Sequence, residues 1–176
     1  MSDFEQRLPI DQIRDGDRVD LIADANDCAA IAERLDLLSL DRLEAHAVLS
    51  REGQQVRAQG RLKASLAQAC VATGEPVPEH VDEAFNLTFV PAPGGTGPEE
   101  EVELENGDLD TIFHDGAGIE LGREIADTLA LSIDPYPRSA EADVALREAG
   151  VMSEEEAGPF AALAALKSKM DRGTAT

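Results

Sequence analysis

Two carboxylates and a histidine on one short segment form the most suggestive chemical group in the sequence. Asp108, Asp110 and His114 occupy alternate positions of the chain, so on a β-strand their side chains would point to one face. Such a set can hold a divalent cation or act as an acid–base pair. Neighbouring carboxylates are also expected by chance in a chain with 36 Asp and Glu among 176 residues. We therefore interpret the segment as a solvated strand face and expect no metal site there.

The remaining reactive side chains do not form a recognisable catalytic pattern. Cys28 and Cys70 are too few for a disulfide framework and indicate a reducing cytoplasm. Cys28 lies at helical spacing on an apolar face, which favours a packed thiol over a nucleophile. The sequence contains no phosphate-binding loop, dinucleotide-binding glycine pattern, zinc-protease motif or Gly-x-Ser-x-Gly motif. We expect a protein that is not an enzyme and uses no cofactor.

The chain is strongly acidic, with 15 Lys and Arg and a formal net charge of −21 at pH 7. A negative field of this size repels DNA and anionic membrane surfaces and attracts basic partners. The same charge could serve solubility alone, and that alternative stays open. The N-terminal residues lack the pattern of a signal peptide, and no apolar run approaches the length of about 18 residues that a membrane span needs. We expect a cytoplasmic protein with a basic partner.

An acid-free stretch at residues 53–74 stands out against this background, and it contains Arg57, Arg61 and Lys63. Apolar and polar residues alternate along it, which is the period of a half-buried β-strand. The basic side chains would then point outward together. We predict a long central strand over residues 54–70 whose outer face is the least anionic surface of the molecule. The alternative is that central strands simply contain few acids.

The other patterns predict an α+β fold with a mainly antiparallel sheet. Three successive strands with short connections suggest a meander around residues 43–90. The predicted strands cover residues 4–10, 43–50, 54–70, 81–89 and 108–115, and the predicted helices cover residues 26–38, 121–133 and 159–170.

These elements divide the chain into three parts. Residues 1–138 form a single α+β domain, with a mobile loop near residues 91–107 that is rich in Pro and Gly. The acidic, Ala-rich residues 139–158 are interpreted as a linker with little fixed structure. The helix at residues 159–170 is amphipathic but only about three turns long, so alone it would be marginal in water. It should dock on its own sheet or on a partner, and both alternatives stay open.

Three blocks of sequence carry a family likeness: LAQACVATGEP at residues 66–76, IELGREI through PYP at residues 119–137, and GPFAALAALK at residues 158–167. In this order they resemble the YceD family of large ribosomal RNA subunit accumulation proteins. The resemblance implies a cytosolic, non-enzymatic factor that supports 23S ribosomal RNA accumulation and assembly of the 50S subunit.

The chain departs from the family pattern at its cysteines. Many members have a Cys-x-x-Cys pair where this chain has Cys70 and Thr73, and a further cysteine near the position of Tyr136. A tetrahedral zinc site needs four ligands, mostly Cys or His, and neither Thr nor Tyr replaces a thiolate in that role. We therefore expect no metal site here either.

The basic residues of the acid-free stretch and the C-terminal helix are the candidate contacts for a partner. Tight RNA binding usually engages about 6 to 10 phosphates and often an aromatic stacking platform, and this set offers neither. We therefore expect a basic ribosomal protein or a pre-50S particle as the partner, steered by the acidic surface, with direct contact to 23S ribosomal RNA as the alternative. The candidate residues are Arg57, Arg61, Lys63, Phe160, Lys167 and Lys169.

Overall fold

The computed structural model describes Phe4, residues 6–92 and residues 111–151. Several predictions fall outside these residues. They concern most of the loop near residues 91–107, the helix at residues 159–170, and the candidate residues Asp108, Asp110, Phe160, Lys167 and Lys169.

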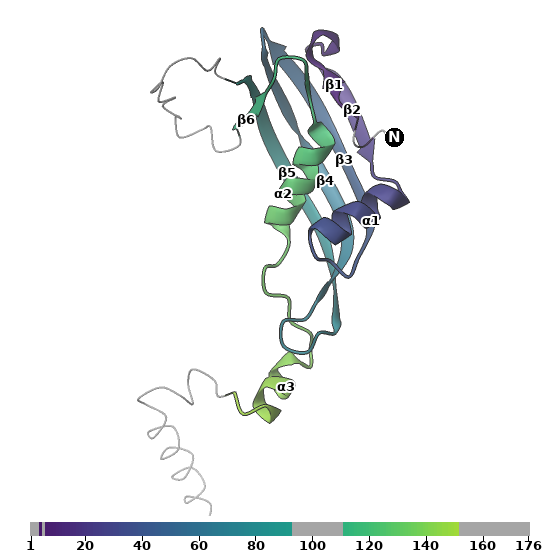
Figure 1. The fold of residues 1–176 in the computed structure, drawn as a ribbon, viewed down its shortest axis with the longest axis vertical. Helices are drawn as coiled ribbons and strands as arrows, with labels where there is room; N and C mark the ends of the chain where they lie inside the picture. The colour runs from purple at the N-terminus through teal and green to yellow at the C-terminus, as the bar shows by residue number, and fades with distance from the viewer. Residues whose placement is uncertain (1–3, 5, 93–110, 152–176) are drawn as a thin grey trace, which may run out of the picture.

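A five-stranded sheet forms the centre of the molecule (Figure 1). In spatial order its strands are β2 (Asp17–Ile22), β3 (Ser39–Glu52), β4 (Gln55–Ala69), β5 (Pro76–Pro91) and β6 (Thr111–His114). The pairs β2–β3, β3–β4 and β4–β5 are antiparallel, whereas β6 runs parallel to β5. A separate two-stranded pair joins β1 (Leu8–Pro9) to β7 (Gly118–Ile119).

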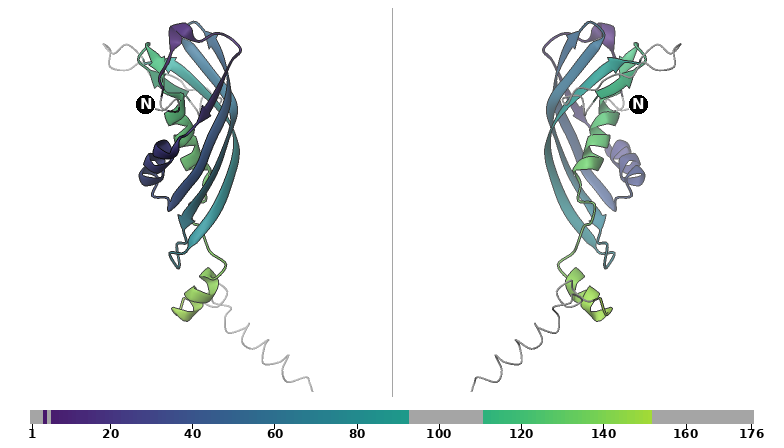
Figure 2. Two further views of the ribbon diagram at one scale, coloured as in Figure 1. Left: turned by 90° about the vertical axis from the view of Figure 1, so that its right-hand side faces the viewer. Right: turned by 90° about the vertical axis from the view of Figure 1, so that its left-hand side faces the viewer.

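The helices gather on one face of this sheet, which we call the inner face (Figure 2). They are α1 (Ala25–Arg34) and α2 (Leu121–Ser132), while α3 (Ala142–Glu148) lies beyond one end of the strands and the short 3-10 helix η1 covers Ile10–Gln12. Alternation along β4 turns Leu62 and its apolar neighbours toward the helices, where Ile125 and Leu129 of α2 are also fully buried. The periodicity of the sequence thus builds a single aliphatic core between sheet and helices.

The prediction of an α+β fold with a mainly antiparallel sheet is confirmed. The predicted central strand over residues 54–70 is β4, within one residue at each end. The predicted helix at 121–133 is α2, whereas the helix predicted at 26–38 ends at Arg34. It stops there because Asp36 takes a left-handed conformation with a φ of 55°.

Three further segments differ from the sequence-based expectation. The strand predicted at residues 4–10 contains only the two residues of β1, followed by η1. Strand β2 was not predicted at all. The acidic residues 139–158, interpreted as a linker with little fixed structure, contain α3. A left-handed Gly150, with a φ of 82°, closes this helix, and the Gly150 and Val151 amides donate to the Arg147 and Leu146 carbonyls.

An ion pair between Arg7 and Asp115 joins the start of the chain to the loop before β7. The Arg7 guanidinium, together with the Ala117 amide that donates to Asp115 Oδ1 at 3.0 Å, lowers the pKa of this carboxyl to about 2. A carboxyl whose pKa is lowered by folding contributes stability above its ordinary pKa of 3.8 and loses it as the pH falls toward 2.

We therefore expect Asp115→Asn to flatten the acid limb of the stability profile. Between pH 3.8 and about 2, the free energy of unfolding of the variant should fall less steeply than that of the parent chain. Urea unfolding followed by circular dichroism at several pH values measures this slope. Asp11→Asn, at a carboxylate of η1 exposed to solvent, is the control, and an equal change in both variants would contradict the assignment.

Candidate interaction surface on the outer face of the sheet

The second face of the five-stranded sheet, which we call the outer face, is left open by the helices. Both α1 and α2 lie against the inner face, and no other described element covers the outer one (Figure 2). Strand register assigns its members. They are Arg18, Asp20 and Ile22 of β2, Arg42, Glu44, His46, Val48, Ser50 and Glu52 of β3, Gln55, Arg57, Gln59, Arg61, Lys63 and Ser65 of β4, and His80, Asp82, Ala84, Asn86 and Thr88 of β5.

This face has the opposite charge balance from the rest of the chain. Its five basic residues are Arg18, Arg42, Arg57, Arg61 and Lys63, and its four acidic residues are Asp20, Glu44, Glu52 and Asp82. With neutral histidines the outer face is therefore net positive, although the whole chain carries a formal charge of −21. The acid-free stretch supplies most of this imbalance.

Three of the four acidic residues have a partner on the same face. Arg61 Nε donates to Asp82 Oδ1 at 2.6 Å, and this hydrogen bond is the main reason why the pKa of Asp82 is lowered and that of Arg61 is raised. Arg42 holds Glu44 with Nη2 at 2.5 Å. His46 contacts the Asp20 carboxylate. Arg61 and Arg42 thus neutralise Asp82 and Glu44, and Asp20 has a polar partner in His46.

The cations that remain are Arg18, Arg57 and Lys63, which form no ion pair within the described part of the chain. Arg57 and Lys63 are six positions apart on one strand, or roughly 20 Å. Arg18 lies two strands away from β4, or roughly 10 Å. The three charges are spread over the face, so they suit several separated anionic groups better than one small ligand.

Apolar side chains are also exposed between these charges. The side chain of Ile22 is 67% exposed and that of Val48 is 41% exposed. Beside Ile22, the outer face is hollowed by about 420 Å³ between β2, β3 and β4, and the lining includes Glu44, His46 and Lys63. Exposed apolar groups among paired and unpaired charges are typical of a surface that meets another macromolecule.

The structure places all three predicted basic residues of β4 on this open face, but it does not make them equivalent. Arg61 is held by Asp82, while Arg57 and Lys63 are unpaired among the described residues. Sequence reasoning missed Arg18, because Asp17–Ile22 was not predicted as a strand. The signal was present, since polar Arg18 and Asp20 alternate with apolar neighbours in that segment.

His114, the third member of the predicted carboxylate–histidine set, is buried in a structural role. Its Nε2 donates to the Gln54 carbonyl at 2.9 Å, and its Nδ1 accepts from the Gly116 amide at 3.0 Å. Both nitrogens of the imidazole ring therefore have a hydrogen-bond partner within the protein. Across the ranges that the structure describes, no group of three or more His, Cys, Asp or Glu residues is arranged to hold a metal ion.

The turn between β4 and β5 forms a second polar cluster, around Cys70. The Ser139 amide donates to Cys70 Sγ at 3.3 Å, and this bond, with further bonds from the Thr73 and Ser139 hydroxyls, lowers the pKa of the thiol to about 6. Both hydroxyls also lie within hydrogen-bonding distance of Glu75 Oε2, at 3.1 and 3.0 Å. Tyr136, in contrast, is 73% exposed. Hydrogen bonds thus join the turn at residues 70–75 to the segment that follows α2.

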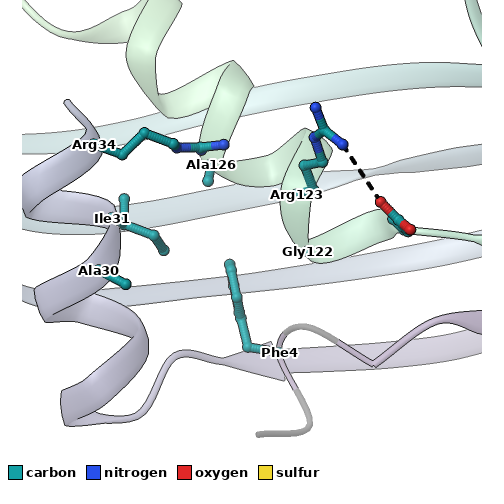
Figure 3. A pocket seen from close by; sticks show the side chains of 8 residues that line it. Phe4, Ala30, Ile31, Arg34, Gly122, Arg123 and Ala126 are labelled. Atoms are coloured by element: carbon teal, nitrogen blue, oxygen red, sulfur yellow. Dashed lines mark ion pairs between the residues drawn. The ribbon is translucent and has the colours of Figure 1, made fainter. Parts of the chain in front are cut away.

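A further hollow of about 350 Å³ lies between α1 and α2 (Figure 3). Phe4 and Ile31 contribute apolar surface, and Arg34 and Arg123 lie at its edge. Arg34 pairs with Asp127 at 3.1 Å, and Arg123 pairs with Glu120 at 3.7 Å. The guanidinium groups are therefore engaged by exposed carboxylates, and the hollow offers less free charge than the outer face.

No helix among the described residues is long and apolar enough to cross a membrane. Comparison with curated proteins and with solved structures found no match. A family model described as "Large ribosomal RNA subunit accumulation protein YceD" matches residues 58–167, which include most of β4 and all of β5 and α2. The family description implies a role in accumulation of large-subunit ribosomal RNA. Because the match extends over more than half of the chain, the protein belongs to the YceD family.

Proposed function

We propose that the protein is a non-catalytic, cytoplasmic factor that supports 23S ribosomal RNA accumulation and large-subunit assembly by binding a basic ribosomal protein or a pre-50S particle. The observation that carries this proposal is the contrast in charge between the outer face and the rest of the described residues. The outer face is net positive. The other described residues include 7 Lys and Arg against 19 Asp and Glu.

The acidic residues outside the outer face, which we call the acidic side, support the choice of a basic protein as the partner. Summed charge of one sign steers an oppositely charged protein to the surface and raises the rate of association. Basic ribosomal proteins carry the matching charge. The contact should weaken with salt, because the exposed charges are screened over a Debye length of about 8 Å at physiological ionic strength.

The outer face supports a more limited contact with RNA. Three unpaired cations are fewer than the roughly 6 to 10 phosphate contacts typical of tight, salt-dependent binding. They can nevertheless touch a few phosphates once the protein is held in place by its acidic side. A molecule with these two surfaces fits between a basic protein and RNA within an assembling particle. Independent binding to 23S ribosomal RNA is the second candidate, favoured by the same three cations.

Capture from lysate at low and high salt, with and without nuclease, tests the proposal. Tagged full-length chain should capture basic large-subunit proteins at low salt, the capture should survive nuclease treatment, and it should be lost at high salt. Capture of 23S ribosomal RNA alone, abolished by nuclease, would instead establish direct RNA binding. Capture of neither component would contradict both candidates.

A further inference from the structure

An apolar groove with an acidic rim lies along α1, on the side away from α2. It has a volume of about 640 Å³ and is bounded by α1 and by the segment that leads into β3. Cys28 and Ala32 of the helix face Leu37, Leu38 and Leu40 across it. The Leu38 side chain is 54% exposed. This volume lies within the range of about 300–1,000 Å³ that ligand-binding pockets occupy, so the groove can accept several side chains.

Three carboxylates surround this α1 groove. They belong to Asp24, Glu33 and Asp41. Asp24 caps α1, whereas Glu33 and Asp41 form no ion pair within the described ranges. Burial is the main cause of the raised pKa of the Cys28 thiol, and the negative charges of Asp24 and Asp41 add to it. The groove therefore favours an occupant with an apolar side and positive charges next to it.

Residues 159–172 of the same chain have this composition. On the helix predicted there, Phe160, Leu163, Leu166 and Met170 share one side. The positive charges of the segment follow at Lys167, Lys169 and Arg172. These three cations, against the single carboxylate of Asp171, match the acidic rim of the groove in charge. The segment is also the part of this acidic chain that most needs a surface to cover its apolar side, because a three-turn helix is marginal alone.

The groove lies toward the end of the sheet near which α3 begins. Ser39, which lines the groove, pairs with Ala67 of β4. Three residues after Ala67, Cys70 contacts Ser139, which lies three residues before the start of α3 at Ala142. The groove and the start of α3 thus lie toward the same end of the sheet (Figure 1). The nine residues that lead from Val151 to Phe160 can span about 30 Å when extended. A tether of this length gives the segment an effective concentration in the millimolar range at the groove.

We infer that residues 159–172 dock in the α1 groove of their own chain, with the apolar side chains on Leu38 and its neighbours and the basic residues on Glu33 and Asp41. Docking in this way covers the exposed apolar surface of the groove and neutralises part of its rim. The inference does not depend on the proposed function, because it concerns contacts within one chain.

Alkylation of the thiol introduced by Leu38→Cys in the full-length chain measures occupancy of the groove, because the side chain at this position is 54% exposed whereas Cys28 is buried in the core. N-ethylmaleimide is added under native conditions, and modification of each cysteine is followed by peptide mass spectrometry. Adding Leu163→Asp removes a central apolar contact, so the thiol at position 38 should react about tenfold faster, corresponding to about 1.4 kcal/mol of lost docking. The rate at Cys70, outside the groove, should not change. Leu131→Asp is the matched control, because Leu131 is exposed and lies outside the groove.

Carbodiimide cross-linking of the monomer gives a second measurement that does not depend on a variant. This reagent joins an amine to a carboxylate only when the two are in contact. Links from Lys167 or Lys169 to Glu33 or Asp41 are expected. Unchanged alkylation at position 38 after Leu163→Asp is added, or lysine links that avoid this rim, would overturn the inference. Protection of this thiol that rises with protein concentration would assign the groove to a second copy, which also overturns it.

Discussion

Gly60→Ala should lower the free energy of unfolding by about 3 kcal/mol or more, the upper end of what overpacking of a core usually costs. Gly60 lies on the inner side of β4, between Ala47 of β3 and Phe85 of β5. A Cβ atom here would lie 1.9 Å from the His46 carbonyl oxygen and 2.8 Å from the Phe85 ring. The first of these contacts is with backbone, which cannot rotate away. The methyl group would force β3 and β4 apart in the middle of the sheet.

Urea unfolding followed by far-ultraviolet circular dichroism measures this effect. Gln59→Ala is the matched control, because Gln59 is the adjacent residue and points outward. Substitutions at exposed positions usually change stability by no more than about 0.5 kcal/mol. A Gly60→Ala chain as stable as the control would mean that the two strands are not packed as described.

Reversing the charge of the two unpaired basic residues of β4 should have the largest effect on function. In Arg57→Glu with Lys63→Glu, folding should be retained because both side chains are exposed and neither forms an ion pair in the described structure. Association with the pre-50S particle should fall about tenfold, the lower end of what electrostatic steering contributes. In cells that depend on this chain, 23S ribosomal RNA should decrease. Binding of a purified basic ribosomal protein should change little, since the acidic side is intact.

The control for this experiment must carry the same change in net charge. Arg14→Glu with Arg147→Glu meets this condition at two exposed residues away from the outer face. Particle association should be retained in this control. Equal loss in both double variants would show that total charge rather than the outer face governs association. No loss in either would remove the outer face from the proposed function.

The sequence predicted those features that depend on local periodicity. Alternation along residues 54–70 predicted β4 and the outward position of its basic side chains, and helical spacing predicted α2. Helix α1 was predicted too long, because apolar spacing continues past the turn at Asp36. The short β2 was overlooked beside a turn signal at Asp15 and Gly16, where polar residues dominate the local composition.

The sequence could not predict features that depend on register between distant strands. In the pairing of β4 with β5, Asp82 lies directly opposite Lys63. Asp82 is therefore the diagonal neighbour of Arg61, and these two side chains form the ion pair. No local pattern in residues 54–70 contains that information, so Arg57, Arg61 and Lys63 looked equivalent. His114 was misjudged for the same reason, since its partner Gln54 is 60 positions earlier in the chain.

The pairing of β1 with β7 has a consequence for how the chain folds as it is made. Leu8 pairs with Ile119, and Phe4, only 1% exposed, packs so tightly against α2 that a Cβ at Gly122 would lie 1.8 Å from its carbonyl oxygen. During synthesis Phe4 and Leu8 are made before their partners, which follow only after more than a hundred further residues have been added. Contacts of such high sequence separation form slowly. A nascent chain therefore keeps Phe4 in water until the segment that carries β7 and α2 has left the exit tunnel.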